Sequence, residues 1–426
     1  MKIDAVRALE IIDSRANPTV EAEAILASGA RGRAMVPSGA SVGKNEAIEL
    51  RDRDDRRWRG KGVSKAVTNV NQIIGPAVKG MEAEVRSVDR ALRELDGTDS
   101  KSRLGANAIL SVSLAVARAI ARERKIPLHS FISEISRTDE ETLPTPMVNI
   151  LSGGLHAGKN LDMQDFLAIP LGARSFREAM DAIGAVYHTI RSMLLERGIP
   201  VLLADEGGFG PNLASNEDAL KLLSEAITRA GLDNSVAIGI DVAASHFWKD
   251  GKYVLSSERA SLDGNAMVDL LDDWSSRYHI LSIEDGCAEE DWQSWKKLTD
   301  RLGKKVQLIG DDLFTTNTSL IRKGISEKVA NSVLIKLNQI GTLSETLDAI
   351  ELCKRGGYAP VISARSGETE DPFIADLAVG TGSGQIKVGS IARSERTAKY
   401  NRLLWIERFS ERKIRFSGKD PFLKHE

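Results

Sequence analysis

The feature of this sequence that most constrains its fold is a series of short apolar runs, each of which stops on polar residues. After residue 146 these runs are DFLAIP, PVLLADEGG, VAIGIDVAA, ILSIEDG, VQLIGDD, SVLIKLNQ, APVISARSGE and QIKVGS, with stretches of helical pattern between most of them. The residues at which the strands are expected to end are spaced by between 22 residues (Arg365 to Lys387) and 43 residues (Asp241 to Glu284). This spacing is typical of successive βα units, in which a helix returns the chain after each strand.

About eight such units close into a barrel, and charged residues at the carboxyl ends of the strands then converge on one site. A doubly wound open sheet is the alternative architecture, but it explains less well why so many strands end in charged residues. We therefore favour a barrel whose strands end at Glu206, Asp241, Glu284, Asp311, Lys336, Arg365 and Lys387.

The first part of the chain has a different pattern. Residues 3–12 and 17–27 alternate in places between apolar and polar side chains, which predicts an antiparallel hairpin. From Leu104 to Lys125, apolar residues recur at spacings of three and four, which predicts a helix. The segment ISRTDEETLPTP is polar and contains two prolines, so we place the domain boundary there. The fold expected is α/β: a small α+β N-terminal domain over residues 1–135, followed by a barrel over 140–426.

Composition narrows the classes of partner. The chain has 58 Lys and Arg against 60 Asp and Glu, a balance that argues against nucleic-acid binding. Its two cysteines are too few for a disulfide framework or a cysteine zinc site, and they fit a reducing compartment. The N-terminal residues lack the apolar core of a signal peptide, and the most apolar helical stretch is too polar to span a bilayer. We expect a cytoplasmic protein with no nucleic-acid or membrane partner.

Three of the expected strand ends are carboxylates, Asp241, Glu284 and Asp311. Carboxylates brought together repel one another unless a cation is present, and hard oxygen ligands suit Mg²⁺. The alternative is that they are three unrelated carboxylates at the mouth of a barrel, since polar strand ends are common. Their occurrence in consecutive units favours the metal site.

Two later strand ends carry lysines, Lys336 and Lys387. A lysine that faces a divalent metal and another lysine is expected to have a pKa lowered from about 10.4 towards neutrality, so it can act as a general base. Each lysine can instead point into the helix layer. Glu206, in a Gly-rich loop, can supply the opposing acid. This combination suggests proton abstraction next to a carboxylate, with electrostatic stabilisation of the enolate, a design used by enolase-superfamily sites.

At this point the sequence resembles the enolase family over nearly its whole length. The matching segments occur in order: PSGASVGKNEAIELRD, GKGV, LGANAILSVSLAVA, HAGKN, DEGGFGPN, SIEDG, GDDLFTTN, LIKLNQIGT, RSGETEDPFIADLAVG and QIKVGSIARSERTAKYN. The resemblance implies a small α+β N-terminal domain on an atypical (β/α)8 barrel, usually in a homodimer. It also implies Mg²⁺-dependent loss of water from 2-phosphoglycerate to give phosphoenolpyruvate, with two ions in each active site.

The resemblance also implies roles for individual residues. The metal ligands fall on Asp241, Glu284 and Asp311, the base on Lys336, and the acid that assists the departing hydroxyl on Glu206. Asp165 falls at a catalytic glutamate position. The substrate-binding positions fall on Lys387 (carboxylate), Arg365 and Ser366 (phosphate), His156, Gln164, and the loop serine Ser41. His246, which follows the first metal ligand, is interpreted as structural or as lying behind the ligands, because Mg²⁺ favours oxygen.

Several positions depart from the family pattern. Ala364 stands where a histidine is expected, which removes a ring, a potential charge and two hydrogen-bonding nitrogens. Asp165 stands where a glutamate is expected, so its carboxylate is pulled back by about 1 Å, more than catalytic geometry tolerates well. Val42, Ser152 and Gly286 replace a threonine, an asparagine and a proline.

These departures leave three hypotheses. The chain is an ordinary glycolytic enolase, a paralogue for a modified or bulkier 2-phosphoglycerate analogue, or a non-catalytic scaffold on the same fold. We favour the paralogue, because Ala364 opens room on the phosphate side. A fitting substrate is a phosphonoformyl ester of glycerate, whose dehydration gives carboxyphosphonoenolpyruvate in phosphonate biosynthesis. The expected partner is therefore a small phosphorylated or phosphonylated acid.

Overall fold

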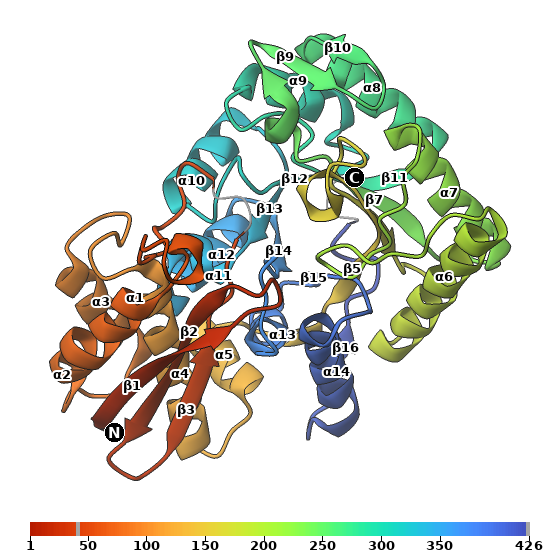
Figure 1. Ribbon diagram of the computed structural model, residues 1–426. Coiled ribbons are helices and arrows are strands. Elements are labelled where there is room, and N and C mark those ends of the chain that lie inside the picture. The colour runs from red at the N-terminus through yellow and green to blue at the C-terminus, as the bar shows by residue number, and fades with distance from the viewer. Residues whose placement is uncertain (40–42, 423–426) are drawn as a thin grey trace.

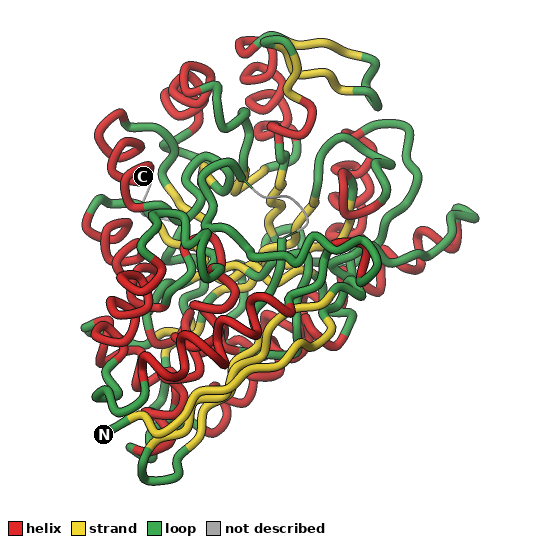
Figure 2. Tube along the Cα trace, turned by 60° about the vertical axis from the view of Figure 1, so that its left-hand side comes forward, coloured by secondary structure: helices red, strands yellow, loops and turns green. Residues whose placement is uncertain are grey.

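The computed structural model describes residues 1–39 and 43–422 of the chain. A three-stranded sheet with its helices packs beside a closed barrel (Figure 1). Figure 2 shows the long strands of the smaller sheet at one side of the molecule, away from the barrel strands. The fold class expected from the sequence is confirmed, and barrel closure excludes the open sheet.

The N-terminal sheet is antiparallel, in the order β1 (Ile3–Ile12), β2 (Pro18–Leu26) and β3 (Arg31–Met35). The hairpin expected from residues 3–12 and 17–27 is confirmed. Strand β3 was not expected, because its sequence RGRAM offers only small and charged residues before the final methionine.

The helix expected from Leu104 to Lys125 is α4 (Ala106–Glu123), which packs on β2 and β3. All but three of its 18 residues are buried, as expected for a helix that is largely apolar around its circumference. Gly32 of β3 permits the close packing, because a Cβ atom there would lie 2.1 Å from the carbonyl oxygen of Ala115.

Two of the remaining helices of this part pack against helices of the barrel. Helix α3 contacts α12, and α5 contacts α13. Arg118 of α4 also donates to Asp371 of the barrel at 2.6 Å. The bounds of these helices are α1 (Ser64–Asn69), α2 (Gly75–Val78), α3 (Val85–Asp96) and α5 (Leu128–Ser136), with single turns η1 (Trp58–Gly60) and η2 (Val70–Ile74).

The barrel strands are parallel except for β6, which is antiparallel to both of its neighbours. Strand β6 follows β5 after a short connection that holds only the turn η3 (Gly154–Ala157), whereas a parallel crossover usually requires a helix. In order around the barrel the strands are β11 (Ile280–Glu284), β12 (Gln307–Gly310), β13 (Ser332–Ile335), β14 (Ala359–Ser363), β15 (Gln385–Gly389), β5 (Thr145–Ser152), β6 (Asp165–Ile169) and β7 (Ala237–Asp241).

One expected strand is wrong and one was missed. The run PVLLADEGG forms a loop between α6 and α7, so Glu206 does not end a barrel strand. Leu202 and Leu203 of this run are 65% and 47% exposed, which shows that the apolar run is not a buried strand. The missed strand is β5, whose sequence TPMVNILS mixes polar and apolar residues and therefore lacks a continuous apolar run.

Helices cover the outside of the barrel. They are α6 (Phe176–Glu196), α7 (Asn216–Arg229), α8 (Gly264–Arg277), α9 (Trp292–Leu302), α10 (Thr318–Glu327), α11 (Leu337–Ile340), α12 (Leu343–Arg355), α13 (Phe373–Gly380) and α14 (Ser394–Phe409). Among residues 1–39 and 43–422, no helix is long and apolar enough to cross a membrane.

Short strands complete the fold. The turn η4 (Ala244–Phe247) and a small sheet follow β7, and two further strands pair near the start of the barrel. Their bounds are β8 (Trp248–Lys249), β9 (Lys252–Leu255), β10 (Ala260–Leu262), β4 (Thr142–Leu143) and β16 (Arg415–Phe416). A separate buried cluster, with residues from five barrel strands, closes the barrel below its polar end: Met147, Leu167, Ile169, Ile309, Leu334, Val361 and Phe422.

Candidate active site

Acidic and basic side chains meet at one end of the barrel, as the sequence predicts. Asp241 and Glu284 are the last residues of β7 and β11, and they are direct partners in the register of these two strands. Asp311 follows β12 directly, and Lys336 follows β13. Lys387 lies within β15. We call these five residues the carboxylate–lysine cluster.

The lysines of this cluster pair with its carboxylates. Lys387 Nζ lies 2.7 Å from Asp241 Oδ2 and 2.6 Å from Glu284 Oε2, and Lys336 Nζ pairs with Asp311 Oδ2. Asp241 and Glu284 are only 2% and 1% exposed. Neither lysine points into the helix layer.

The ion pairs determine the lysine pKa values in the absence of a bound metal. Burial disfavours the charged ammonium of Lys336, but the carboxylates of Asp311 and Glu284 together outweigh burial and raise the pKa of Lys336 above its usual range. The pKa of Lys387 is likewise raised, against burial, by Asp241 and Glu284. The lowered lysine pKa expected from the sequence presupposes a bound cation, which would draw these carboxylates away from the ammonium groups.

The donor set fits a hard divalent cation. The three carboxylates offer only oxygen, the ligand that Mg²⁺ prefers. Three carboxylates face only two ammonium groups, and burial and repulsion from Asp241 raise the pKa of the Glu284 carboxyl well above its usual range. The residues present therefore fit the Mg²⁺ that the resemblance implies.

The three carboxylates are not, however, drawn tightly around one point. Among the described residues, two groups of three side chains have ligand atoms within 4.8 Å of one another. The expected trio is neither of them, and the ammonium of Lys387 bridges two of its members. The two groups are His156, Asp165 and Glu206, and Asp285, Asp311 and Asp312.

The first of these groups, which we call the histidine–carboxylate cluster, lines a cavity that Asp241, Asp311, Lys336 and Lys387 also line. His156 belongs to η3, Asp165 begins β6, and Glu206 comes from the loop between α6 and α7. His156 Nδ1 lies 3.6 Å from Asp165 Oδ2 and 3.9 Å from Glu206 Oε1. The structure thus brings Glu206 to the cavity from a loop instead of a strand end.

Asp165 lines the cavity and is anchored by its neighbours. Its Oδ1 accepts hydrogen bonds from Asn149 Nδ2 and, at 3.2 Å, from Ser152 Oγ. Burial raises the pKa of Asp165, although His156 acts in the opposite direction. The shorter acid is therefore anchored at the back of the cavity by β5.

Gln164 connects the two clusters. Its side-chain Nε2 donates to Asp241 Oδ2 at 3.0 Å, and its backbone N–H donates to the Asp241 carbonyl at 2.9 Å. Gln164 also lines the cavity, as expected for a residue that contacts a ligand. Its position is thereby fixed relative to the first expected metal ligand.

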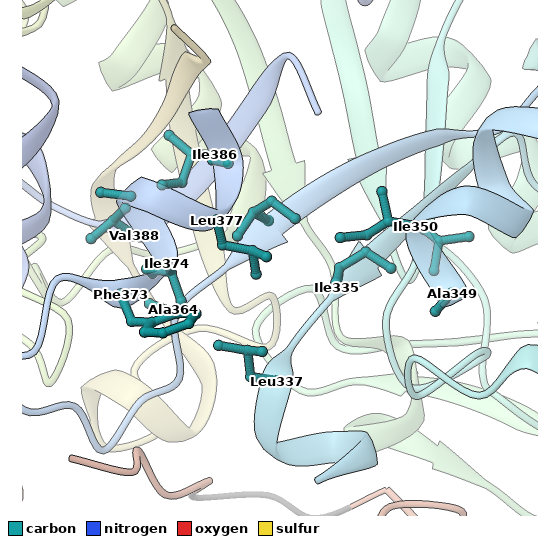
Figure 3. Close-up of a cluster of buried hydrophobic side chains, with 14 of the residues drawn as sticks. Ile335, Leu337, Ala349, Ile350, Ala364, Phe373, Ile374, Leu377, Ile386 and Val388 are labelled. Atoms are coloured by element: carbon teal, nitrogen blue, oxygen red, sulfur yellow. The ribbon is translucent and has the colours of Figure 1, made fainter. Parts of the chain in front are cut away.

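The phosphate-side residues follow β14. Arg365 donates to Glu46 Oε2 at 2.9 Å and to Asn338 Oδ1 at 2.9 Å, so Glu46 of the N-terminal part occupies its guanidinium. Ser366 lines the cavity beside it. Ala364 also lines the cavity, and Figure 3 places it within a cluster of buried apolar side chains close to Phe373.

Some cavity residues were not assigned from the sequence. Glu46, Asp285 and Asp312 all line the cavity. The doubled acids in SIEDG and GDD are a signal for the last two, because the second acid follows the strand end directly. Asp285 accepts the backbone N–H groups of Asp311 and Asp312 at 2.9 Å each. Ser41 and Val42 lie outside the described residues.

A closed barrel with charged side chains gathered at one end of its strands is the architecture of a barrel enzyme. Residues 140–425 match the family model described as "Enolase, C-terminal TIM barrel domain", and residues 3–132 match "Enolase, N-terminal domain". The chain therefore belongs to the enolase family. At the level of the family this supports an enolase-type dehydratase, a lyase or related enzyme that acts on small phosphorylated acids and typically uses Mg²⁺.

Proposed function

We propose that the protein removes water from a 2-phosphoglycerate-like acid that carries an additional group. A phosphonoformyl ester of glycerate fits, and its product is carboxyphosphonoenolpyruvate, an intermediate of phosphonate biosynthesis. The observation that carries this proposal is Ala364, which lines the cavity next to Arg365 and Ser366 where the family motif has a histidine. The missing ring leaves room beside the groups expected to bind phosphate.

Proton abstraction is assigned to the carboxylate–lysine cluster. Lys336 is the proposed base, and Lys387 the proposed partner of the substrate carboxylate, since both ammonium groups lie at the cavity. Asp241, Glu284 and Asp311 would hold Mg²⁺, with two ions in each site. Bound there, Mg²⁺ would stabilise the negative charge that develops on the substrate carboxylate.

Departure of the hydroxyl is assigned to the histidine–carboxylate cluster. Glu206 is the proposed acid; His156 Nδ1 lies 3.9 Å from its Oε1, and Asp165 lines the same cavity. Although burial acts against it, His156 and other nearby cations hold the pKa of Glu206 below its usual range. A Glu206 acid must therefore gain its proton when substrate binds.

Phosphate binding is assigned to Arg365 and Ser366, with Gln164 and Ser41 as further substrate contacts. In this structure Glu46 occupies two N–H groups of Arg365, at 2.9 and 3.2 Å. A guanidinium has five N–H groups, so phosphate can share it or displace Glu46. The proposal therefore includes an exchange of anions at Arg365.

The second candidate is an ordinary glycolytic enolase, which the intact carboxylate–lysine cluster supports. Turnover of 2-phosphoglycerate, followed by ultraviolet absorbance and compared with turnover of phosphonoformyl-glycerate, separates the two. We expect weak or no turnover of 2-phosphoglycerate. If the protein instead converts 2-phosphoglycerate at a rate ordinary for metabolic enzymes, with a median of about 10 s⁻¹, it is a glycolytic enolase.

The third candidate is a non-catalytic scaffold. Titration with Mg²⁺ in the presence and absence of a phosphorylated acid tests it, because a scaffold has no reason to bind the two together.

We also propose a homodimer or larger homo-oligomer in the cytoplasm. The aromatic side chains of Trp405 and Phe409 on α14, 59% and 61% exposed, support association, and sedimentation analysis tests it.

A further inference from the structure

The histidine–carboxylate cluster brings one imidazole and two carboxylates close together in a buried place. The ligand atoms of His156, Asp165 and Glu206 all lie within 4.8 Å of one another, and all three residues are buried. Two carboxylates face one imidazole with no lysine or arginine among the three. Such a set has a net negative charge when the imidazole is neutral.

Two atoms of the cluster lack hydrogen-bond partners. His156 Nδ1 and Asp165 Oδ2 are buried and make no hydrogen bond to any described residue, although they lie 3.6 Å apart. Gln164 Oε1 and Asn149 Oδ1, in the same region, also have none. Buried polar atoms are nearly always paired, so orphaned atoms in one place indicate a missing group. Three of the four are acceptors, so the missing group is a cation or a hydrogen-bond donor.

The packing behind Asp165 fixes the direction of its orphaned oxygen. Its other oxygen accepts from Asn149 and Ser152, and these two side chains are wedged against Gly208, where a Cβ atom would lie 2.7 Å from Asn149 and 2.8 Å from Ser152. A carboxylate whose second oxygen is hydrogen-bonded is the usual arrangement of a metal ligand.

We propose that His156, Asp165 and Glu206 bind a divalent transition-metal ion such as Zn²⁺ or Co²⁺, at a site separate from the carboxylate–lysine cluster. One imidazole nitrogen and two carboxylate oxygens are a donor set that suits Zn²⁺ and Co²⁺, whereas Mg²⁺ prefers oxygen alone. Metal–ligand bonds of about 2.0 to 2.2 Å place the ligand atoms about 3 to 3.5 Å apart. The spacings of 3.6 and 3.9 Å need only a small contraction.

The site has a consequence for catalysis, and this step rests on the proposed function. The proposed function assigns Glu206 and His156 to the departing hydroxyl of the substrate. A cation bound to these two residues therefore keeps the substrate hydroxyl from reaching them. Zn²⁺ should then inhibit competitively with substrate while Mg²⁺ stays bound. Binding of the cation itself requires no substrate, so the two proposals fail independently.

The test is a titration of the full chain with Zn²⁺ in the presence of saturating Mg²⁺, followed by calorimetry, with Co²⁺ absorption as a second signal. We expect one site per chain. His156→Ala and Asp165→Asn should each weaken it at least about 10-fold, the size of effect seen when a metal ligand is disturbed. His246→Ala is the matched control, because His246 lines the same cavity but lies outside the cluster.

Three results would overturn the proposal: no Zn²⁺ binding beyond the Mg²⁺ sites, equal binding by the His156 and Asp165 variants, or equal loss in the His246 variant. Thermal unfolding in the absence of metal checks that each variant is folded. If His156→Ala is unfolded, His156→Gln keeps the side-chain volume closer and removes the imidazole. Zn²⁺ binding by His156→Gln then replaces Zn²⁺ binding by His156→Ala in the test.

Discussion

The two sides of the cavity solve the problem of buried charge in different ways. In the carboxylate–lysine cluster, each ammonium pairs with one or two carboxylates, so that two ammonium groups offset most of the charge of three carboxylates. In the histidine–carboxylate cluster, His156 Nδ1 lies 3.6 Å from Asp165 Oδ2, and these two buried atoms have no hydrogen-bond partner among the described residues. Among the described residues, the side chains of the first cluster pair with one another, whereas those of the second leave buried atoms unpaired.

This difference indicates where sequence change is tolerated. The paired cluster keeps all five residues of the family pattern, because removal of one partner leaves an uncompensated buried charge. The side without internal pairs contains Asp165 and Ser152 and lies in the same cavity as Ala364, the three departures that affect described residues of the cavity or its support. A ligand with a different shape can therefore be accommodated there without disturbing the ion pairs.

The largest expected effect is loss of the proposed base. Lys336→Ala should reduce exchange of the substrate α-proton with solvent by about 10⁴-fold, the upper end for a general base. Deuterium exchange followed by nuclear magnetic resonance measures it. Mg²⁺ binding should persist, because Asp311 keeps its hydrogen bond from Gln339 at 2.9 Å. Exchange at the wild-type rate in this variant would show that the base is another group.

The next effect concerns the stability of the paired side. Lys387→Met leaves Asp241 and Glu284 buried without their ammonium, which should cost about 3 to 5 kcal/mol of unfolding free energy in the absence of metal. Urea unfolding in a chelating buffer measures this. Mg²⁺ should restore part of the loss, and adding Asp241→Asn to the variant should restore another part. Wild-type stability of Lys387→Met would contradict the pairing described here.

A smaller effect is expected when the residues of the family pattern are restored at Ala364 and Asp165. Ala364→His combined with Asp165→Glu should raise turnover of 2-phosphoglycerate at least about 100-fold, since either a placed acid or a polar group alone contributes about 10² or more. The same double change should lower turnover of phosphonoformyl-glycerate, because the ring refills the space beside Arg365. Steady-state kinetics with both substrates checks it. A parallel fall for both would mean that the departures are not adaptations to a substrate.

Much of the carboxylate–lysine cluster could be predicted from the sequence. Parallel strands bring their carboxyl ends to one rim, so an apolar run that stops on a charged residue locates that residue before any contact is known. Asp241, Glu284, Asp311 and Lys336 lie where this rule puts them. The rule needs only local sequence.

The other side could be found only through the family resemblance. Glu206 reaches the cavity on a loop, and its apolar flank is exposed, so the strand inferred from that run is wrong. Asn149, which fixes Asp165, lies on the strand β5 that local pattern missed. The pairing of Arg365 with Glu46 joins residues 319 positions apart, and no local pattern predicts such a contact.

The smallest expected effect tests whether an orphaned carboxylate always indicates a ligand. Asp89 of α3 is fully buried outside the cavity; its Oδ2 accepts the Ser344 N–H at 2.8 Å, and its Oδ1 has no partner among the described residues. Burial raises its pKa from 3.8 to about 6, even though Ser113 and Ser344 act in the opposite direction. The folded protein thus holds this proton more tightly than the unfolded chain does.

The contribution of Asp89 to stability should therefore be greatest below its unfolded pKa of 3.8 and fall by about 3 kcal/mol as the pH rises through about 6. Asp89→Asn should flatten this part of the pH profile of the unfolding free energy, measured with urea from acidic to neutral pH. Mg²⁺ and substrate should leave the difference between wild type and variant unchanged, because Asp89 contacts no ligand site. If Mg²⁺ changes the difference in unfolding free energy between wild type and Asp89→Asn, the buried charge of the N-terminal part is coupled to the cavity. The contrast between the two clusters of the cavity would then extend beyond the cavity itself.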